Sequence, residues 1–165
     1  MVPGGKFTAH DLSETVRIAR TVDAEAVSMI GVLEHLPDPR GVLAAIRTNP
    51  KVRYLYLSVP LFCPAVFFEM AFPHVWPRHL STAHTHIYTE QSLVWAREEF
   101  GFDLIGEWWF GGDVMDLFRS VTVSIPEPMR DRWREMFAPA IDGMQSQLDV
   151  RHMASEVHQV LRVRP

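Results

Sequence analysis

The fold is decided by residues 24–60, which read AEAVSMIG (24–31), VLEHLPDP (32–39), RGVLAAIRTNPK (40–51) and VRYLYLSVP (52–60). The first and last of these runs are short and rich in Val, Ile, Leu and Tyr, as is typical of strands buried on both faces. Two strands joined by a crossover helix form a βαβ unit, in which the strands are parallel. Ligands of open α/β sheets bind at the carboxyl ends of the strands, so the turn at 31–39 is where we expect a site.

Composition limits the class of protein. The chain has 165 residues, 47% of them hydrophobic and 22% charged, which suits one soluble globular domain. The formal net charge of −4 argues against nucleic acid as a partner. No apolar run approaches the roughly 20 residues that a membrane span requires, and the N-terminus lacks the apolar core of a signal peptide. The single Cys63 excludes an internal disulfide, so we expect a cytoplasmic protein.

The rest of the chain alternates between strand and helix patterns. Asp38 and Pro39 predict a helix start, since an acidic cap followed by proline is a common opening of a helix. The expected elements, in order, are a short strand ending at Asp11, a helix or loop at 13–22, strands at 24–31 and 52–59, an irregular proline-rich lid at 61–88, a helix from Thr89 to Gly101 and a strand at 102–110. Alternation of this kind predicts an α/β layer fold with a mainly parallel sheet.

The C-terminal third is predicted to be mostly helical. A short helix at 113–120 should point Val114, Met115, Leu117 and Phe118 inward, and a longer helix should start at Pro126 or Pro128 and kink at Pro139. Residues 157–163 complete the pattern as a last strand. No repeat or composition shift marks a second domain, so residues 1–165 are interpreted as one domain.

Several of these motifs resemble class I S-adenosylmethionine (SAM)-dependent methyltransferases. VLEHLPDP (32–39) is similar to the segment after that family's fourth strand, and HIYTEQSL (86–93) is similar to its histidine-aromatic-threonine helix start. A strand ending in Ser58-Val59-Pro60 and a Gly101-Phe102 strand start complete the match, which covers about Phe7 to Phe110 well and the rest loosely. The resemblance implies a Rossmann-like methyltransferase fold with an antiparallel last strand. It also implies SAM as cofactor and methyl transfer to a small-molecule acceptor.

One departure from the family pattern qualifies the expected activity. The family binds SAM through a glycine-rich loop after its first strand, and no such strand–loop–helix occurs here; Pro3-Gly4-Gly5 lies too near the start. The resemblance therefore implies an N-terminally truncated, partial methyltransferase-like domain. Half a sheet exposes an edge, so we expect self-association or pairing with a missing N-terminal half. The alternative function is a non-catalytic fragment or interaction module that cannot bind SAM alone.

The resemblance also assigns candidate cofactor residues. Asp11, with Leu12, is where the family places an acidic residue that accepts a hydrogen bond from the adenine amino group. Gly31, Val32 and His35 are where the family chain passes the methionine part of SAM. The alternative for each is a purely structural role: a cap or solvated carboxylate at Asp11, and a strand-end turn in which His35 packs locally.

The histidines supply the candidates for catalysis. His86 matches the family histidine at the junction of lid and helix and is the preferred general base, with His84 second, because imidazole titrates near neutral pH. Alternatively, His86 fixes the lid, and methyl transfer proceeds by alignment alone. The spacing of His74, His79, His84 and His86 suggests metal binding as an alternative. It matches no known ligand motif, however, so no metal is expected. Glu34 is given no chemistry, and Cys63 is expected to be a buried thiol.

Overall fold

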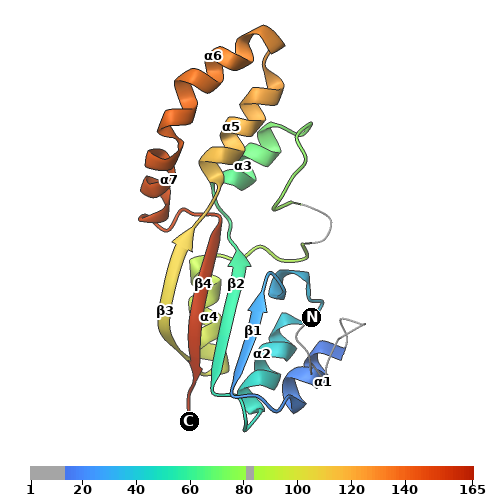
Figure 1. Ribbon diagram of the computed structural model, residues 1–165. Helices are drawn as coiled ribbons and strands as arrows, with labels where there is room; N and C mark the ends of the chain where they lie inside the picture. The colour runs from blue at the N-terminus through green and yellow to red at the C-terminus, as the bar shows by residue number, and fades with distance from the viewer. Residues whose placement is uncertain (1–13, 81–83) are drawn as a thin grey trace, which may run out of the picture.

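The computed structural model describes residues 14–80 and 84–165 of the chain (Figure 1). The elements follow in the order α1 (Glu14–Thr21), β1 (Ala26–Ile30), the 3-10 turn η1 (Leu33–His35), α2 (Pro39–Thr48), β2 (Tyr54–Pro60), α3 (Pro64–Ala71), α4 (Glu90–Phe100), β3 (Phe102–Phe110), α5 (Asp113–Ser124), α6 (Glu127–Phe137), the 3-10 turn η2 (Ala138–Ala140), α7 (Ile141–Asp149) and β4 (Glu156–Val163). The strand expected to end at Asp11 lies outside the described residues.

One four-stranded sheet carries the fold, with its strands in the order β1-β2-β4-β3. β1 and β2 are parallel and pair Met29 with Leu57. β4 runs antiparallel to both of its neighbours, β2 and β3. Three strands thus share one direction and the last strand opposes them, which confirms the predicted α/β, Rossmann-like sheet.

Local sequence explains the crossover helix between β1 and β2. The Asp38 side chain accepts a hydrogen bond from the Gly41 amide at 2.8 Å, and Pro39 occupies the first turn of α2. This is the N-terminal capping predicted from sequence. The apolar side of α2 then places Leu43 and Ile46 over the sheet. The βαβ unit at 26–60 is therefore confirmed.

Capping residues at both ends determine where the helix α4 begins and ends. Thr89 and Ser92 form a capping box, each side chain accepting from the other residue's main-chain amide. Gly101 ends the helix at φ 70°, in the left-handed region that favours glycine. The chain then enters β3 at Phe102, as predicted.

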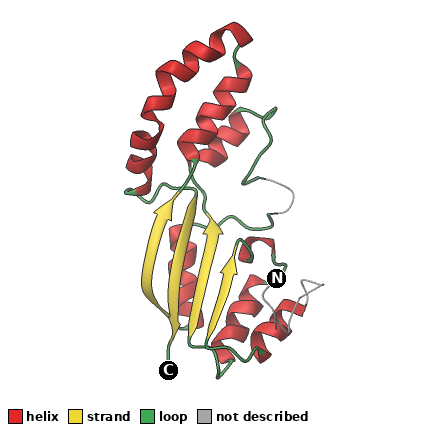
Figure 2. Ribbon diagram, viewed as in Figure 1, coloured by secondary structure: helices red, strands yellow, loops and turns green. Residues whose placement is uncertain are grey.

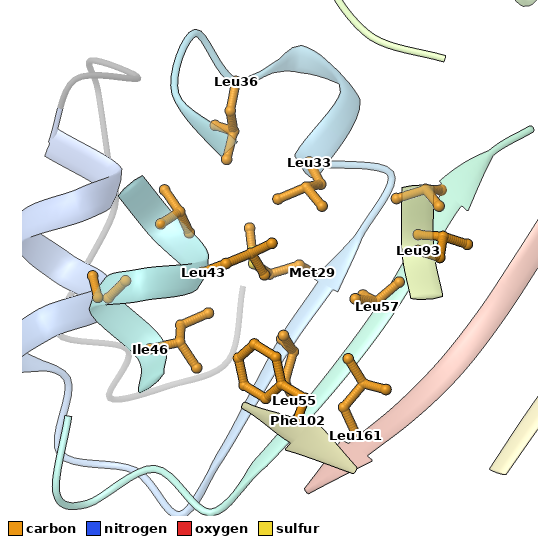
Figure 3. Close-up of a cluster of buried hydrophobic side chains, with 14 of the residues drawn as sticks. Met29, Leu33, Leu36, Leu43, Ile46, Leu55, Leu57, Leu93, Phe102 and Leu161 are labelled. Carbon is orange, nitrogen blue, oxygen red and sulfur yellow. The ribbon is translucent and has the colours of Figure 1, made fainter. Parts of the chain in front are cut away.

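The main core lies between the sheet and the helices α1, α2 and α4. Figure 3 shows its centre, where Met29 and Leu57 from the strands meet Leu43 from α2 and Leu93 from α4. Alternate residues of β2 and β4 point into this core, because side chains of a strand alternate between the two faces of a sheet, whereas β3 buries only Phe102 there. Burial of this one face accounts for most of the apolar packing around the sheet.

The opposite face of the sheet carries no helix from the described part of the chain. In Figure 1 this face is turned toward the viewer, with α4 behind it. Pairing across the strands brings Ile30, Ser58, His158 and Trp108 into one row on this face. Ile30 is 55% exposed and Trp108 is 45% exposed. The sheet is thus covered on one side and open on the other.

A second group of helices stands beyond the carboxyl ends of β1, β2 and β3 (Figure 2). It contains α3 and the α5–α7 segment between β3 and β4. Asp113, at the start of α5, is fully buried and accepts a hydrogen bond from the Ala65 amide at 3.0 Å, which ties α5 to α3. The break at Pro139 is confirmed, because η2 separates α6 from α7.

Two predictions in these regions are wrong. The lid at 61–88 is not irregular throughout, since it contains α3; Pro64 starts that helix and Pro73 follows its end, so the prolines delimit a helix. The helix predicted at 113–120 extends to Ser124, and Met115 points outward while Asp113 and Asp116 are buried. No helix among the described residues is long and apolar enough to cross a membrane.

Candidate functional site

The turn after β1 is built around Gly31. Its φ of +60° lies in the left-handed region, where a residue with a Cβ is strained. Its amide donates to the Ser58 hydroxyl at 3.2 Å and approaches the Ser58 carbonyl at 3.4 Å, so the turn stays tied to β2. The chain then makes the short turn η1, in which Leu33 and Glu34 are buried. Glu34 is thereby placed beside the carboxyl ends of β1 and β2.

A second loop, residues 84–88, is fastened to main-chain carbonyls of this turn by hydrogen bonds from its amides and hydroxyls. The Glu34 carbonyl accepts from the Thr85 amide at 2.9 Å, the Thr85 hydroxyl at 2.8 Å and the His86 amide at 3.2 Å. The Tyr88 hydroxyl donates to the Leu33 carbonyl at 3.2 Å. The two loops, about 50 residues apart in sequence, therefore form one continuous wall.

A cavity of about 390 Å³ opens beside this wall, at the carboxyl ends of β1 and β2. Its lining comprises Gly31, Glu34, Pro60, Trp76, Pro77, Arg78, His79, His84, Ser155 and Glu156. The Arg78 guanidinium is already paired with Asp116 at 2.9 Å. The cavity lies where a ligand of an open α/β sheet is expected, so the predicted crevice is present.

Three potential metal ligands meet at this wall: the Glu34 carboxylate and the imidazoles of His35 and His84. One donor atom from each lies within 4.8 Å of the others. His35 Nε2 is 3.9 Å from Glu34 Oε1, and the two imidazole rings lie 4.8 Å apart. The Glu34 side chain is almost fully buried, and its Oε2 has no hydrogen-bond partner.

His86 faces a different cavity. Its ring borders an apolar space of about 320 Å³ between α2 and α4, whose floor includes Leu57 and Leu161. His86 Nδ1 lies 2.8 Å from the Thr85 hydroxyl, whose own proton is directed to main-chain carbonyls. Nδ1 therefore carries the proton and Nε2 holds the free lone pair. His86 therefore borders this second space and does not line the cavity at the strand ends.

The loop before the site is organised by Glu69. Its carboxylate accepts main-chain hydrogen bonds from Arg78, His79 and Leu80 and lies 2.9 Å from His79 Nδ1. Burial acts to raise the pKa of Glu69, but these hydrogen bonds outweigh it and hold the pKa below its ordinary value. His79 is thus occupied by Glu69, and its carbonyl is left to accept from His84.

Two further groups are unsuited to proton transfer. Burial raises the pKa of the Tyr88 hydroxyl, and the nearby Glu34 charge raises it further. Burial also raises the pKa of the Cys63 thiol, with Asp113 adding to the effect. Cys63 is free and buried, as predicted.

The predicted site residues are only partly brought together. Gly31 lines the cavity at the strand ends, Val32 packs against the core, and His35 joins Glu34 and His84. His86 lies on the other cavity, and Asp11 and Leu12 lie outside the described residues. Sequence reasoning missed Glu34; its only signal was an acidic residue directly before a histidine in a turn after a buried strand.

The turn at Gly31 can be compared with what the family resemblance implies for SAM. The turn at Gly31 leaves its backbone open to the cavity, which is what close approach of a ligand to the chain requires. β1, however, is an edge strand among the described residues, so no neighbouring strand supplies a glycine-rich loop facing Gly31. The part of SAM that such a loop would hold has no binding residues in the described part of the chain.

Comparisons with known proteins agree with this arrangement. The family model of a methyltransferase domain matches residues 6–107, more than half of the chain. A search of curated proteins finds no match. Among solved structures, a SAM-dependent methyltransferase from Archaeoglobus fulgidus is 13% identical with a TM-score of 0.52, over 97% of this chain and 69% of that one.

A sarcosine dimethylglycine methyltransferase proposed for Galdieria sulphuraria is 9% identical with a TM-score of 0.50. The match covers 91% of this chain and 57% of that chain, so the present chain spans little more than half of that protein's length. At these identities the likeness concerns the fold alone.

Proposed function

The chain belongs to the methyltransferase domain family, and we propose that it acts as part of a SAM-dependent methyltransferase that modifies a small-molecule acceptor. The observation that carries this proposal is the family match over residues 6–107, which spans β1, η1, α2 and β2 with their cavity of about 390 Å³. SAM supplies an electrophilic methyl group when bound. The turn at Gly31 would hold one flank of that cofactor, with Val32 and His35 beside it.

A small acceptor is favoured by charge and by the dimensions of the cavities. The net charge of −4 gives no basic surface for a nucleic acid. Cavities of about 320 and 390 Å³ fall at the lower end of the range for small-molecule sites. Neither observation distinguishes oxygen, nitrogen or carbon as the atom that receives the methyl group.

His86 is the proposed general base. Its Nε2 holds the lone pair, and the Thr85 hydroxyl fixes the ring by accepting from Nδ1. Because the ring borders the apolar space between α2 and α4, His86 takes a proton only if the acceptor reaches that space. If the acceptor stays at the strand ends, transfer proceeds by alignment without His86.

Calorimetric titration of the 165-residue chain with SAM and with S-adenosylhomocysteine tests the proposal. Saturable heat with either ligand supports a cofactor site on this chain. Absence of heat, together with binding by a longer version that carries a glycine-rich loop, would favour the alternative of a non-catalytic module that cannot bind SAM alone. The second candidate is supported by the outer edge of β1, which pairs with no other strand among residues 14–80 and 84–165.

We propose that the open edge is filled by a second copy of this chain. The Glu25 carbonyl and the Gly31 amide both bond to β2, so the alternate residues Ala26, Ser28 and Ile30 direct their main-chain groups outward. Unpaired edges of this kind recruit another strand. A separate N-terminal half is the competing occupant.

The cytoplasmic location expected from the single Cys63 also stays a prediction.

A further inference from the structure

Three side chains at the turn after β1 have the composition and spacing of a metal site. A carboxylate oxygen of Glu34 and one nitrogen each of His35 and His84 lie within 4.8 Å of one another. We propose that Glu34, His35 and His84 bind a divalent transition-metal ion such as Zn²⁺. The proposal does not rest on methyl transfer, because it concerns ligand geometry alone.

The burial of the Glu34 carboxylate is the strongest evidence for a bound cation. Glu34 is 4% exposed, and its Oε2 has no hydrogen-bond partner. An ionised oxygen buried without a partner is costly, so buried charges are normally paired or coordinate a metal. Arg78, which lines the same cavity, is already paired with Asp116. An ion between Glu34 and the two imidazoles would supply the missing partner.

The hydrogen bond made by His84 selects the neutral tautomer that can bind a metal. Its Nδ1 lies 3.0 Å from the His79 carbonyl, and a carbonyl can only accept, so Nδ1 carries the proton. Nε2 is left with the lone pair that a metal requires. Metal-ligating histidines usually donate their other ring N–H to a carboxylate, a backbone carbonyl or a water, and this hydrogen bond fixes the orientation of the ring.

Hydrogen bonds between the two loops position the proposed ligands. Glu34 and His35 come from η1, and His84 comes from the loop that three hydrogen bonds fasten to the Glu34 carbonyl. His79, which orients His84, is itself held by the buried Glu69 carboxylate. Ligands on two locked loops lose little conformational entropy when an ion binds, which favours affinity.

The donor set selects the class of metal. Two imidazoles and one carboxylate are the ligands of catalytic zinc and of non-haem iron sites, and both keep a coordination position open for water or substrate. Mg²⁺ and Ca²⁺ prefer oxygen ligands and match this set poorly. The assignment gives His35 a role different from the cofactor contact that the family resemblance implies.

Metal binding is tested on the full chain after chelator treatment and removal of the chelator. Zn²⁺ is titrated by calorimetry, and Co²⁺ is titrated by its visible absorption, which reports coordination directly. We expect one ion per chain and, for Co²⁺, the spectrum of a site with fewer than six ligands. Glu34→Gln and His84→Ala should each weaken Zn²⁺ binding by at least about tenfold, since loss of even a supporting partner costs 10–100-fold.

His74→Gln is the matched control, because His74 is exposed, hydrogen-bonds to Ser124 and lies outside the cluster. This variant should bind Zn²⁺ as the wild type does. Circular dichroism and the unfolding temperature without metal show whether each variant is folded. A wild type that takes up no ion, or unchanged affinity in folded Glu34→Gln and His84→Ala, would overturn the proposal. So would an equal loss in His74→Gln.

Discussion

The Thr85 hydroxyl donates to the main-chain carbonyl of Glu34 at 2.8 Å, across 51 positions of sequence. The Thr85 amide donates to the same carbonyl at 2.9 Å, and the hydroxyl also lies 3.3 Å from the Leu36 carbonyl. One side chain therefore joins the turn after β1 to the loop before α4. The joint matters for function because the cavity at the strand ends and the proposed metal ligands both depend on it.

Replacement of Thr85 by valine keeps the shape of the side chain and removes the hydroxyl. We expect Thr85→Val to lower the free energy of unfolding by about 1 kcal/mol, the usual net value of one hydrogen bond. Urea denaturation measures the change. Thr21→Val is the control, since the Thr21 hydroxyl donates to the Arg17 carbonyl, one turn back on the same helix. Equal losses in the two variants would show that the Thr85 link adds nothing beyond a local hydrogen bond.

Leu57 tests the core that supports the site. It lies opposite Met29 on the neighbouring strand and is 3% exposed. Leu57→Ala should lower the free energy of unfolding by about 2–5 kcal/mol, through lost apolar burial and the cavity left behind. Leu80→Ala is the matched control, because Leu80 is 45% exposed. A loss below about 1 kcal/mol at Leu57 would contradict the described packing of β1 against β2.

The elements around the first strand were predictable because their signals are local. An acceptor at Asp38, a proline at position 39 and two short runs rich in apolar residues each act over a few residues, so they specify β1, α2 and β2 without knowledge of distant contacts. The Thr89 and Gly101 ends of α4 follow for the same reason. The family resemblance then supplied the direction of the last strand.

The site was less predictable because it depends on contacts between distant segments. Glu34 and His84 are 50 positions apart, and only the folded loops bring them together. The proline-rich composition of 61–88 obscured α3, whose prolines stand at its boundaries. On α5, apolar periodicity pointed Met115 inward, whereas the buried position belongs to Asp113, which caps a different helix.

The buried Glu69 carboxylate should make stability depend on pH. Hydrogen bonds hold its folded-state pKa below the ordinary value of 4.5, so the folded protein binds fewer protons at this group than the unfolded chain. The stabilisation is therefore complete above pH 4.5 and disappears as the pH falls through the lower, folded-state pKa. At pH 7, Glu69→Gln should lower the free energy of unfolding by about 1–3 kcal/mol.

Urea denaturation of wild type and Glu69→Gln between neutral and acid pH measures this effect. The difference in the free energy of unfolding between wild type and Glu69→Gln should become smaller as the pH falls below 4.5, because protonation removes the charge from the wild-type side chain as well. Glu135→Gln is the control, since Glu135 is exposed on α6 and pairs only with Arg132 there. A difference that stays constant with pH would mean that the Glu69 charge is not what stabilises this loop.

The edge of β1 makes a prediction about assembly. Ser28 is the central outward-facing residue of β1, so two antiparallel copies of the strand can pair about it, with Ala26 of one copy opposite Ile30 of the partner subunit. Sedimentation equilibrium should show a dimer for the wild type and for Ser28→Ala. Ser28→Lys should be monomeric, because a lysine on an edge strand blocks pairing with another strand and places two like charges side by side in the dimer. A wild type that is monomeric at every concentration, or a Ser28→Lys variant that dimerises as strongly as Ser28→Ala, would exclude this edge as the interface.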